Sequence, residues 1–296
     1  MKKLMTIASL ALLLTACGKS EKEFDATGTF EATEVTISAE QSGTLLMFAL
    51  EEGDNIEAGR EVGLIDTTQL WLKLQQADAT KAVYQSQKPD MEKQIAATRQ
   101  QLEKAKTERQ RYQELVNDGA APGKMLDDAT NQVKVLQRQL DAQISSLGNQ
   151  LSTLNSQLST VDVQKSQLRD QLQKCHIVAP LTGTVLEKYV EQGEYVAPGK
   201  PLFKMGDMQQ MYLRAYVTSA QLQQVKIGQE VKVYADFGNN QRQEYVGTVS
   251  WVSSRSEFTP KTILTDDERA DLVYAVKIGL KNDGAIKIGM YGEVKF

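Results

Sequence analysis

Residues 42–66, SGTLLMFALEEGDNIEAGREVGLID, and residues 182–206, TGTVLEKYVEQGEYVAPGKPLFKMG, are two copies of one motif, and this repeat decides the fold. Three glycines recur 140 positions later without a gap: Gly43, Gly53 and Gly59 correspond to Gly183, Gly193 and Gly199. Glycine tolerates the positive φ angles of tight turns, and the apolar residues between these glycines alternate as in half-buried strands. A sheet of about 25 residues cannot bury a core alone, so the two copies must pack together as one β domain.

The segment between the two copies, residues 69–174, has a different pattern. It is rich in glutamine, and its apolar residues recur at steps of three and four, which is the heptad pattern of a coiled coil. Two stretches of nearly equal length, 69–117 and 124–173, flank the turn NDGAAPG, so an antiparallel hairpin would return the chain to its starting point. Pro89 interrupts the first stretch, and a kink or a short break is expected there.

The last ninety residues change pattern again. From Met208 onward, short segments of alternating apolar and polar residues predict a small β barrel or sandwich. One short helix is expected between its first two strands, capped by Thr218 or Ser219 and closing at Gly228. The fold class is therefore multidomain α+β: a β barrel-sandwich split by a long antiparallel α-helical coiled-coil hairpin, followed by a small β barrel.

The N-terminal residues 1–16 have the features of an export signal. Two lysines precede the apolar run LMTIASLALLLTA, which is shorter than the roughly 20 residues that span a bilayer. The tetrapeptide LTAC at 14–17 resembles the lipobox of bacterial lipoproteins, which implies that Cys17 becomes the acylated first residue of the mature chain. The alternative is ordinary cleavage after Ala16 with Cys17 as a bystander. Residues 17–33 would then hold the lipid anchor, a linker and the first strand.

Charge and motif content exclude several classes of function. The formal net charge is −4, and no basic segment suits nucleic acid. Cys175 lies next to His176, the sole histidine, but neighbours in a strand point to opposite faces and a structural zinc site needs four ligands. No phosphate loop, nucleophile elbow or zinc-protease motif is present. We therefore expect no enzyme activity, no cofactor and no metal site.

Three methionines step by three at the end of the second copy: Met205, Met208 and Met211. The spacing suggests a copper or silver site. However, position 205 corresponds to Ile65 in the first copy, and Met208 and Met211 flank the entry to the next domain. An apolar packing role is therefore favoured for all three.

The repeated motif resembles the half-motif of lipoyl and biotinyl carrier domains. Those carriers bear a modified lysine on the hairpin that joins the halves. Here the first copy continues from Ile65 to Gln69 without a lysine, and the first lysine after it, Lys73, lies in the helical segment. The carrier interpretation therefore lacks its attachment site.

The chain as a whole resembles the HlyD or membrane-fusion family of periplasmic adaptors. IVAPLTGTV at 177–185 matches the family's IxAPxxGxV pattern, and the three parts follow in the family's order. The resemblance implies the following domains: lipoyl-like halves at 34–68 and 175–206, an α-helical hairpin at 69–174 and a β-barrel domain at 207–296.

The resemblance also implies a function and partners. Such an adaptor links an inner-membrane exporter to a TolC-like outer-membrane channel for efflux or secretion. The run EFTPKTILTDDERADLVYAVKI at 257–278 resembles adaptors of ABC exporters, so an ABC permease and ATPase are favoured over a proton-driven partner. Family members work as rings of about six copies. The lipid anchor would hold this chain in the periplasm at the inner membrane, although the outer membrane remains an alternative.

The hairpin tip is the candidate contact with the channel. Family members that dock TolC-like channels carry an arginine, a leucine four residues on and a serine seven further. Arg111 and Leu115 match this pattern, whereas Pro122 occupies the serine position and offers neither a hydroxyl nor a backbone N–H. A structural coiled-coil lipoprotein without an exporter is the alternative function, in which Arg111 and Leu115 would be a solvated flank.

Overall fold

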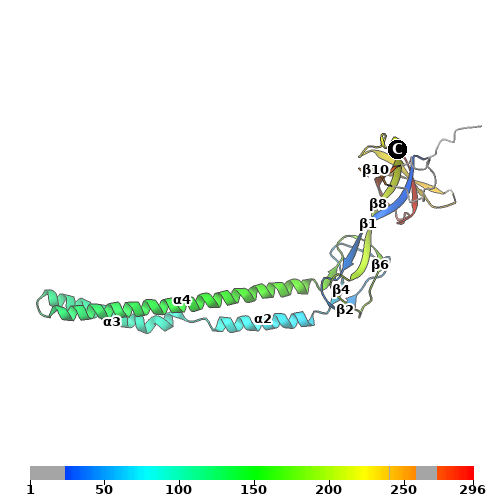
Figure 1. Ribbon diagram of the computed structural model, residues 1–296. Helices are drawn as coiled ribbons and strands as arrows, with labels where there is room; N and C mark the ends of the chain where they lie inside the picture. The colour runs from blue at the N-terminus through cyan, green and yellow to red at the C-terminus, as the bar shows by residue number, and fades with distance from the viewer. Residues whose placement is uncertain (1–23, 240, 258–271) are drawn as a thin grey trace, which may run out of the picture.

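The computed structural model describes residues 24–239, 241–257 and 272–296. The molecule is elongated: a helical hairpin projects from one of two β domains that lie end to end (Figure 1). The helices are α2 (Thr68–Ser86), α3 (Met91–Asn117), α4 (Gly123–Gln173) and α5 (Ser219–Leu222). The strands are β1 (Ala26–Ser38), β2 (Gly43–Phe48), β3 (Asn55–Ile56), β4 (Glu61–Ile65), β5 (His176–Val178), β6 (Gly183–Lys188), β7 (Tyr195–Val196), β8 (Pro201–Thr218), β9 (Glu230–Asp236), β10 (Arg242–Val252), β11 (Val273–Lys281) and β12 (Tyr291–Lys295).

The two sequence copies build one intertwined sandwich. Strand β2 pairs with β7 and β3 pairs with β6, so each copy completes the sheet of the other. The tight turns cross over in the same way: Gly53 N–H donates to the Val185 carbonyl at 2.9 Å, and Gly193 N–H donates to the Leu45 carbonyl at 2.8 Å. Both glycines have φ near +90°, where a side chain would be strained (φ 93° and 91°).

The core of this sandwich repeats the internal symmetry of the sequence. Its buried residues include pairs that lie 140 positions apart: Ala39 and Ala179, Leu45 and Val185, Leu50 and Val190, Ile56 and Val196, Val62 and Leu202, and Ile65 and Met205. Each copy therefore supplies half of one apolar interior. The prediction that the two copies pack together is confirmed.

The hairpin leaves and re-enters the sandwich at one place. The Ile65 N–H donates to the Cys175 carbonyl at 2.9 Å, so the last strand residue before the helices contacts the second residue after them. Cys175 is fully buried, and burial together with the nearby Asp66 carboxylate raises the pKa of its thiol. The expectation that the chain returns to its starting point after the helical insertion is confirmed.

Three helices make the hairpin, with α2 and α3 following one another along α4 (Figure 1). The break falls at residues 87–90, around Pro89, as expected. Asp90 caps α3 by accepting a hydrogen bond from the Lys93 N–H at 3.2 Å. The break also divides the apolar seam in two: Ala77, Val161 and Leu168 form one buried cluster, and Ile95, Leu102, Leu136, Leu140 and Leu147 form the other.

Two reciprocal ion pairs join α2 to α4. Lys81 contacts Asp162 at 2.6 Å, and Lys165 contacts Asp78. In each helix the lysine and the aspartate are three residues apart, so the two pairs fit one alignment of the helices. Both lysines stand where the three-and-four spacing of the helices would otherwise place an apolar residue. Polar pairs at such positions specify the register of two helices.

We expect Asp162→Asn to weaken the hairpin at neutral pH but not in acid. The Lys81 ammonium donates to Asp162 and holds the pKa of this carboxyl below its ordinary value. A depressed carboxyl pKa stabilises the folded state above the ordinary value, and this stabilisation is lost as the pH falls through the folded pKa. Urea midpoints of the variant should therefore lie below wild type at pH 7 and approach it as the pH falls below the ordinary pKa of an aspartate. Asp141→Asn, on the same helix but hydrogen-bonded within it, is the control; an Asp162→Asn deficit that persists in acid would contradict the assignment.

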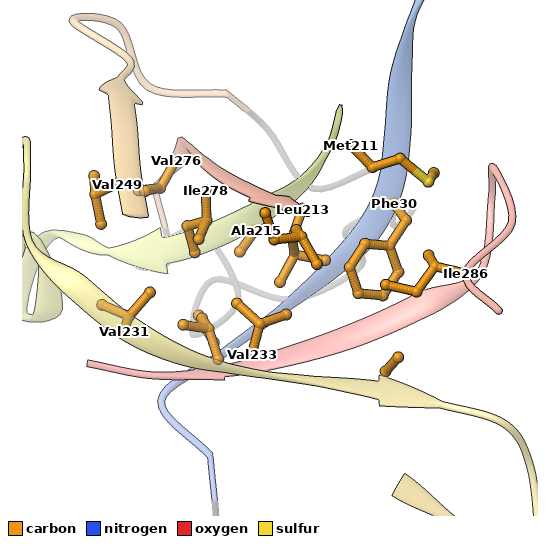
Figure 2. Packing of buried hydrophobic residues seen from close by; sticks show 14 of the residues in the cluster. Phe30, Met211, Leu213, Ala215, Val231, Val233, Val249, Val276, Ile278 and Ile286 are labelled. Carbon is orange, nitrogen blue, oxygen red and sulfur yellow. The ribbon is translucent and has the colours of Figure 1, made fainter. Parts of the chain in front are cut away.

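The second β domain is a closed barrel of six strands. Its order is β1-β12-β9-β10-β11-β8, and the pairing of β1 with β8 closes it. Figure 2 shows its apolar interior, in which Phe30 of β1 lies beside Ile286 and close to Leu213 of β8. The sequence pattern indicated only an anchor, a linker and a first strand for residues 17–33. In the structure the first half of β1 is instead a full member of this C-terminal barrel.

The two β domains are connected by a continuous ribbon of β1 and β8. Its pairing shifts register between Ala32 and Thr33, where residues 208–210 of β8 bulge out. Asn282, only 7% exposed, holds this bulge: its side-chain amide donates to the Met208 carbonyl at 2.9 Å, and its backbone N–H donates to the Gln209 carbonyl at 2.9 Å. The bulge therefore belongs to the barrel and sets how the sandwich joins it.

The short helix after β8 is present but shorter than expected. Thr218 caps α5 and forms a capping box with Gln221, which confirms the expected start. The expected end at Gly228 is wrong, because the helix stops at Leu222. Gly228 lies instead in the turn before β9, where its N–H donates to the Val249 carbonyl at 2.8 Å.

Candidate docking site at the hairpin tip

The turn at the far end of the hairpin is built from backbone hydrogen bonds. The Ala120 N–H donates to the Leu115 carbonyl at 2.8 Å and the Gly119 N–H donates to the Val116 carbonyl at 3.1 Å. With Gly119 at φ +71°, these bonds are those of a Schellman motif, which satisfies the last carbonyls of α3. Pro122 follows in an extended conformation immediately before α4. The end of the hairpin is thus an ordered turn that directs the flanking side chains outward.

The structure places all three sequence-predicted tip residues at this end. Arg111 is exposed and donates to the Glu108 carboxylate at 3.1 Å, while its guanidinium carbon lies 5.7 Å from the centre of the Tyr112 ring. Leu115, one turn further along α3, is 37% exposed. Pro122 is exposed on the other side of the turn. The contacts that orient Arg111 therefore come from its own helix and not from Leu115 or Pro122.

A groove between α3 and α4 continues this surface away from the turn. Its volume is about 320 Å³, and it is lined by Ala105, Glu108, Tyr112, Met125, Asp128, Ala129 and Gln132. Met125 is 47% exposed, so an apolar side chain of α4 is accessible at the groove. The groove has no signature in the amino-acid sequence. The seven-residue step from Glu108 to Leu115 was a signal that the two share a flank of α3, but the residues opposite on α4 follow only from the register.

A larger cleft of about 1190 Å³ lies between the two β domains, but its side chains already bond to one another. Thr184 donates to Asn55 at 2.7 Å. Asp283 accepts from the Tyr245 hydroxyl at 3.1 Å, and burial together with this carboxylate raises the pKa of Tyr245 to about 12. Asn55 and Asp283, both of the lining, are thus already hydrogen-bonded, Asp283 to a tyrosine outside the cleft, so the cleft is a weaker candidate for ligand binding than the groove.

The residues considered for metal binding lie in different surroundings. Cys175 is buried, whereas the neighbouring His176 is exposed and contacts Glu61 at 2.7 Å. Met205 belongs to the sandwich core and Met211 to the barrel core, so the three methionines do not converge. Within the described parts of the chain, no group of three or more His, Cys, Asp and Glu side chains is arranged to hold a metal ion.

Two sequence-derived features lie wholly or partly outside the described residues. Cys17, the predicted lipidation site, precedes them, and most of the segment 257–278 that resembles adaptors of ABC exporters falls in the gap between residues 257 and 272. Among the helices of residues 24–239, 241–257 and 272–296, none has an apolar stretch long enough to cross a bilayer.

Comparison with known proteins gives concordant results. Residues 33–205 match the family described as RND MFP, barrel-sandwich hybrid domain, where MFP denotes membrane fusion protein. A UPF0194 membrane protein of Citrobacter koseri is 31% identical over 284 residues, covering 89% of this chain and 85% of the relative.

Solved structures show the same fold at lower sequence identity. MacA from Actinobacillus actinomycetemcomitans aligns over 91% of this chain and 76% of its own, with 21% identity and a TM-score of 0.57. The membrane fusion protein Spr0693 from Streptococcus pneumoniae R6 aligns over 91% of this chain and 99% of its own, with 15% identity and a TM-score of 0.55.

Proposed function

Because this chain belongs to the membrane fusion proteins with a barrel-sandwich hybrid domain, we propose that it is a periplasmic adaptor of the HlyD type, which connects an inner-membrane exporter to an outer-membrane channel. One observation carries the proposal. The hairpin begins and ends at the Ile65–Cys175 contact, so its tip lies at the opposite end of the molecule from the β domains (Figure 1). A protein of this shape acts by joining two partners that are far apart.

Each end of the molecule has a separate role in this proposal. The two β domains would face the exporter, and the tip with Arg111 and Leu115 would face a TolC-like channel. An ABC permease and ATPase are the preferred exporter because of the resemblance in residues 257–278. Acyl chains on Cys17 would retain the protein at the inner membrane. The proposed role needs no catalytic residue and no cofactor, since the protein would act by holding the exporter and the channel together.

A ring of about six copies would surround the conduit. The two-part seam described above supports lateral association, because a hairpin interrupted at residues 87–90 has two short apolar clusters in place of one continuous apolar seam. In a ring, neighbouring hairpins would pack side by side as a continuous coiled-coil wall. Closed cyclic symmetry is the general rule for such assemblies.

The test is photocrosslinking in cells from position 115 of the full, lipidated chain. A photoreactive residue at the tip should capture an outer-membrane channel protein. The control carries the same photoreactive residue at position 163, where Val163 is exposed on α4 far from the tip; it should not capture the channel. Recovery of self-products or peptidoglycan alone from position 115 would favour a structural envelope lipoprotein and overturn the adaptor proposal.

A further inference from the structure

The groove beside the tip lies on the same flank of the hairpin as Leu115. On α3, Glu108 and Leu115 are seven residues apart, which places them on one side of the helix. On α4, Met125 and Gln132 are also seven apart, and both line the groove together with Glu108. The exposed leucine at the end of the rod therefore continues into a hollow between the two helices, and the two features present one surface.

The lining of the groove combines apolar and acidic residues. Two alanines, Ala105 and Ala129, lie beside the larger Tyr112 and Met125. Two acidic residues, Glu108 of α3 and Asp128 of α4, also line it. An aromatic face with nearby carboxylates is a receptor for a guanidinium or an ammonium group, because cation–π attraction and charge-assisted hydrogen bonds act on the same cation.

One of the two carboxylates is already paired within α3. Arg111, which does not line the groove, donates to Glu108 at 3.1 Å and lies next to Tyr112 in the sequence. Among the described residues, none forms a hydrogen bond or an ion pair with the Asp128 carboxylate.

We propose that this groove is a subsite for an arginine or lysine side chain of the channel protein on which the tip docks, and this rests on the proposed function. The cation would lie against Tyr112 and Met125 and pair with Asp128, while Leu115 and Arg111 contact the surrounding surface. Charge complementarity argues for a cationic occupant, because Glu108 and Asp128 both line the groove and Asp128 has no ion-pair partner among the described residues. In a ring, several copies would use the same contact at once, so a modest interaction at each tip adds up to stable docking.

The experiment compares Asp128→Arg with Asp127→Arg in the full lipidated chain. Asp127 is the adjacent carboxylate, is exposed and does not line the groove. The two variants therefore carry the same change of charge at neighbouring positions of α4. Channel capture from a photoreactive residue at position 115 is the readout. We expect Asp128→Arg to reduce capture roughly tenfold and Asp127→Arg to leave it near wild type, since a buried like-charge contact opposes docking. Urea midpoints of both variants check that the hairpin still folds.

The outcomes separate this proposal from the adaptor proposal. If wild type captures the channel and the two variants behave alike, the subsite is overturned while the adaptor function stands. If wild type captures no channel, both fail. Recovery of Asp128→Arg by a Lys→Glu or Arg→Glu change in the channel would support the subsite directly. Capture of only a second copy of this chain from a photoreactive residue at position 132 would show that the groove is a contact between copies, and would overturn the proposal.

Discussion

Gly28→Ala is expected to destabilise the C-terminal barrel by about 3 kcal/mol, at the upper end of the usual cost of overpacking. A Cβ at this position would lie 2.0 Å from the Arg214 carbonyl oxygen and 2.6 Å from the Ala215 Cα. Both atoms are backbone of β8, and the pairing of β1 with β8 closes the barrel, so neither strand can move aside without opening it.

The matched control for this substitution is Gly279→Ala in β11. There the added Cβ would meet nothing closer than the Thr248 carbonyl oxygen at 4.0 Å. Glycine to alanine at an unstrained position reduces the freedom of the unfolded chain, so the control should be neutral or slightly more stable. Thermal and urea unfolding followed by circular dichroism will measure both. Equal midpoints for the two variants would show that the barrel does not depend on the close approach of β1 and β8.

Cys17→Ser is expected to move the protein from the membrane fraction to the soluble periplasmic fraction almost completely. Each buried methylene of an acyl chain contributes about 0.8 kcal/mol, and stable anchoring takes more than one chain. The described helices offer no spanning segment as a substitute. Without acylation, retention would depend on protein partners and on whether the apolar segment at 4–16 is still removed.

Fractionation after carbonate washing measures the effect, and the mass of the mature wild-type chain should show acylation at Cys17. Ser20→Ala, a change in the same short segment that leaves the thiol intact, is the control. If the Cys17→Ser protein has lost residues 1–16 by mass and still stays in the membrane fraction at wild-type levels, the anchor is not a lipid on this cysteine.

Local sequence patterns were sufficient to predict the structure of a segment where that structure depends only on the segment's own residues. The turn glycines of the two copies, the break around Pro89 and the cap on Thr218 each depend on the conformational limits of one or two residues. The end of α5 could not be predicted from local residues in the same way. Its expected stop at Gly228 rested on a glycine that serves a different turn, because the N–H of that glycine pairs with Val249 of β10, which lies far from it in the sequence.

The residues of the candidate site also differ in whether the sequence could predict them. Arg111 and Leu115 were found from their spacing on one helix, which fixes the side of the helix they share. Met125 and Asp128 were not found, because their position opposite Tyr112 depends on how α3 and α4 align. That alignment is a property of the folded hairpin, in which the ordered turn and the interhelical contacts act together.

The sequence by itself determined that two half-domains share one core, because neither copy has enough apolar surface to fold alone and their buried positions repeat at one interval. It also determined that the insertion is helical and returns to its origin. Only the tertiary structure decided that β1 belongs to both β domains and that a groove opens beside the tip. Both depend on pairing between residues distant in the chain, and no local preference encodes which distant strand or helix a segment will meet.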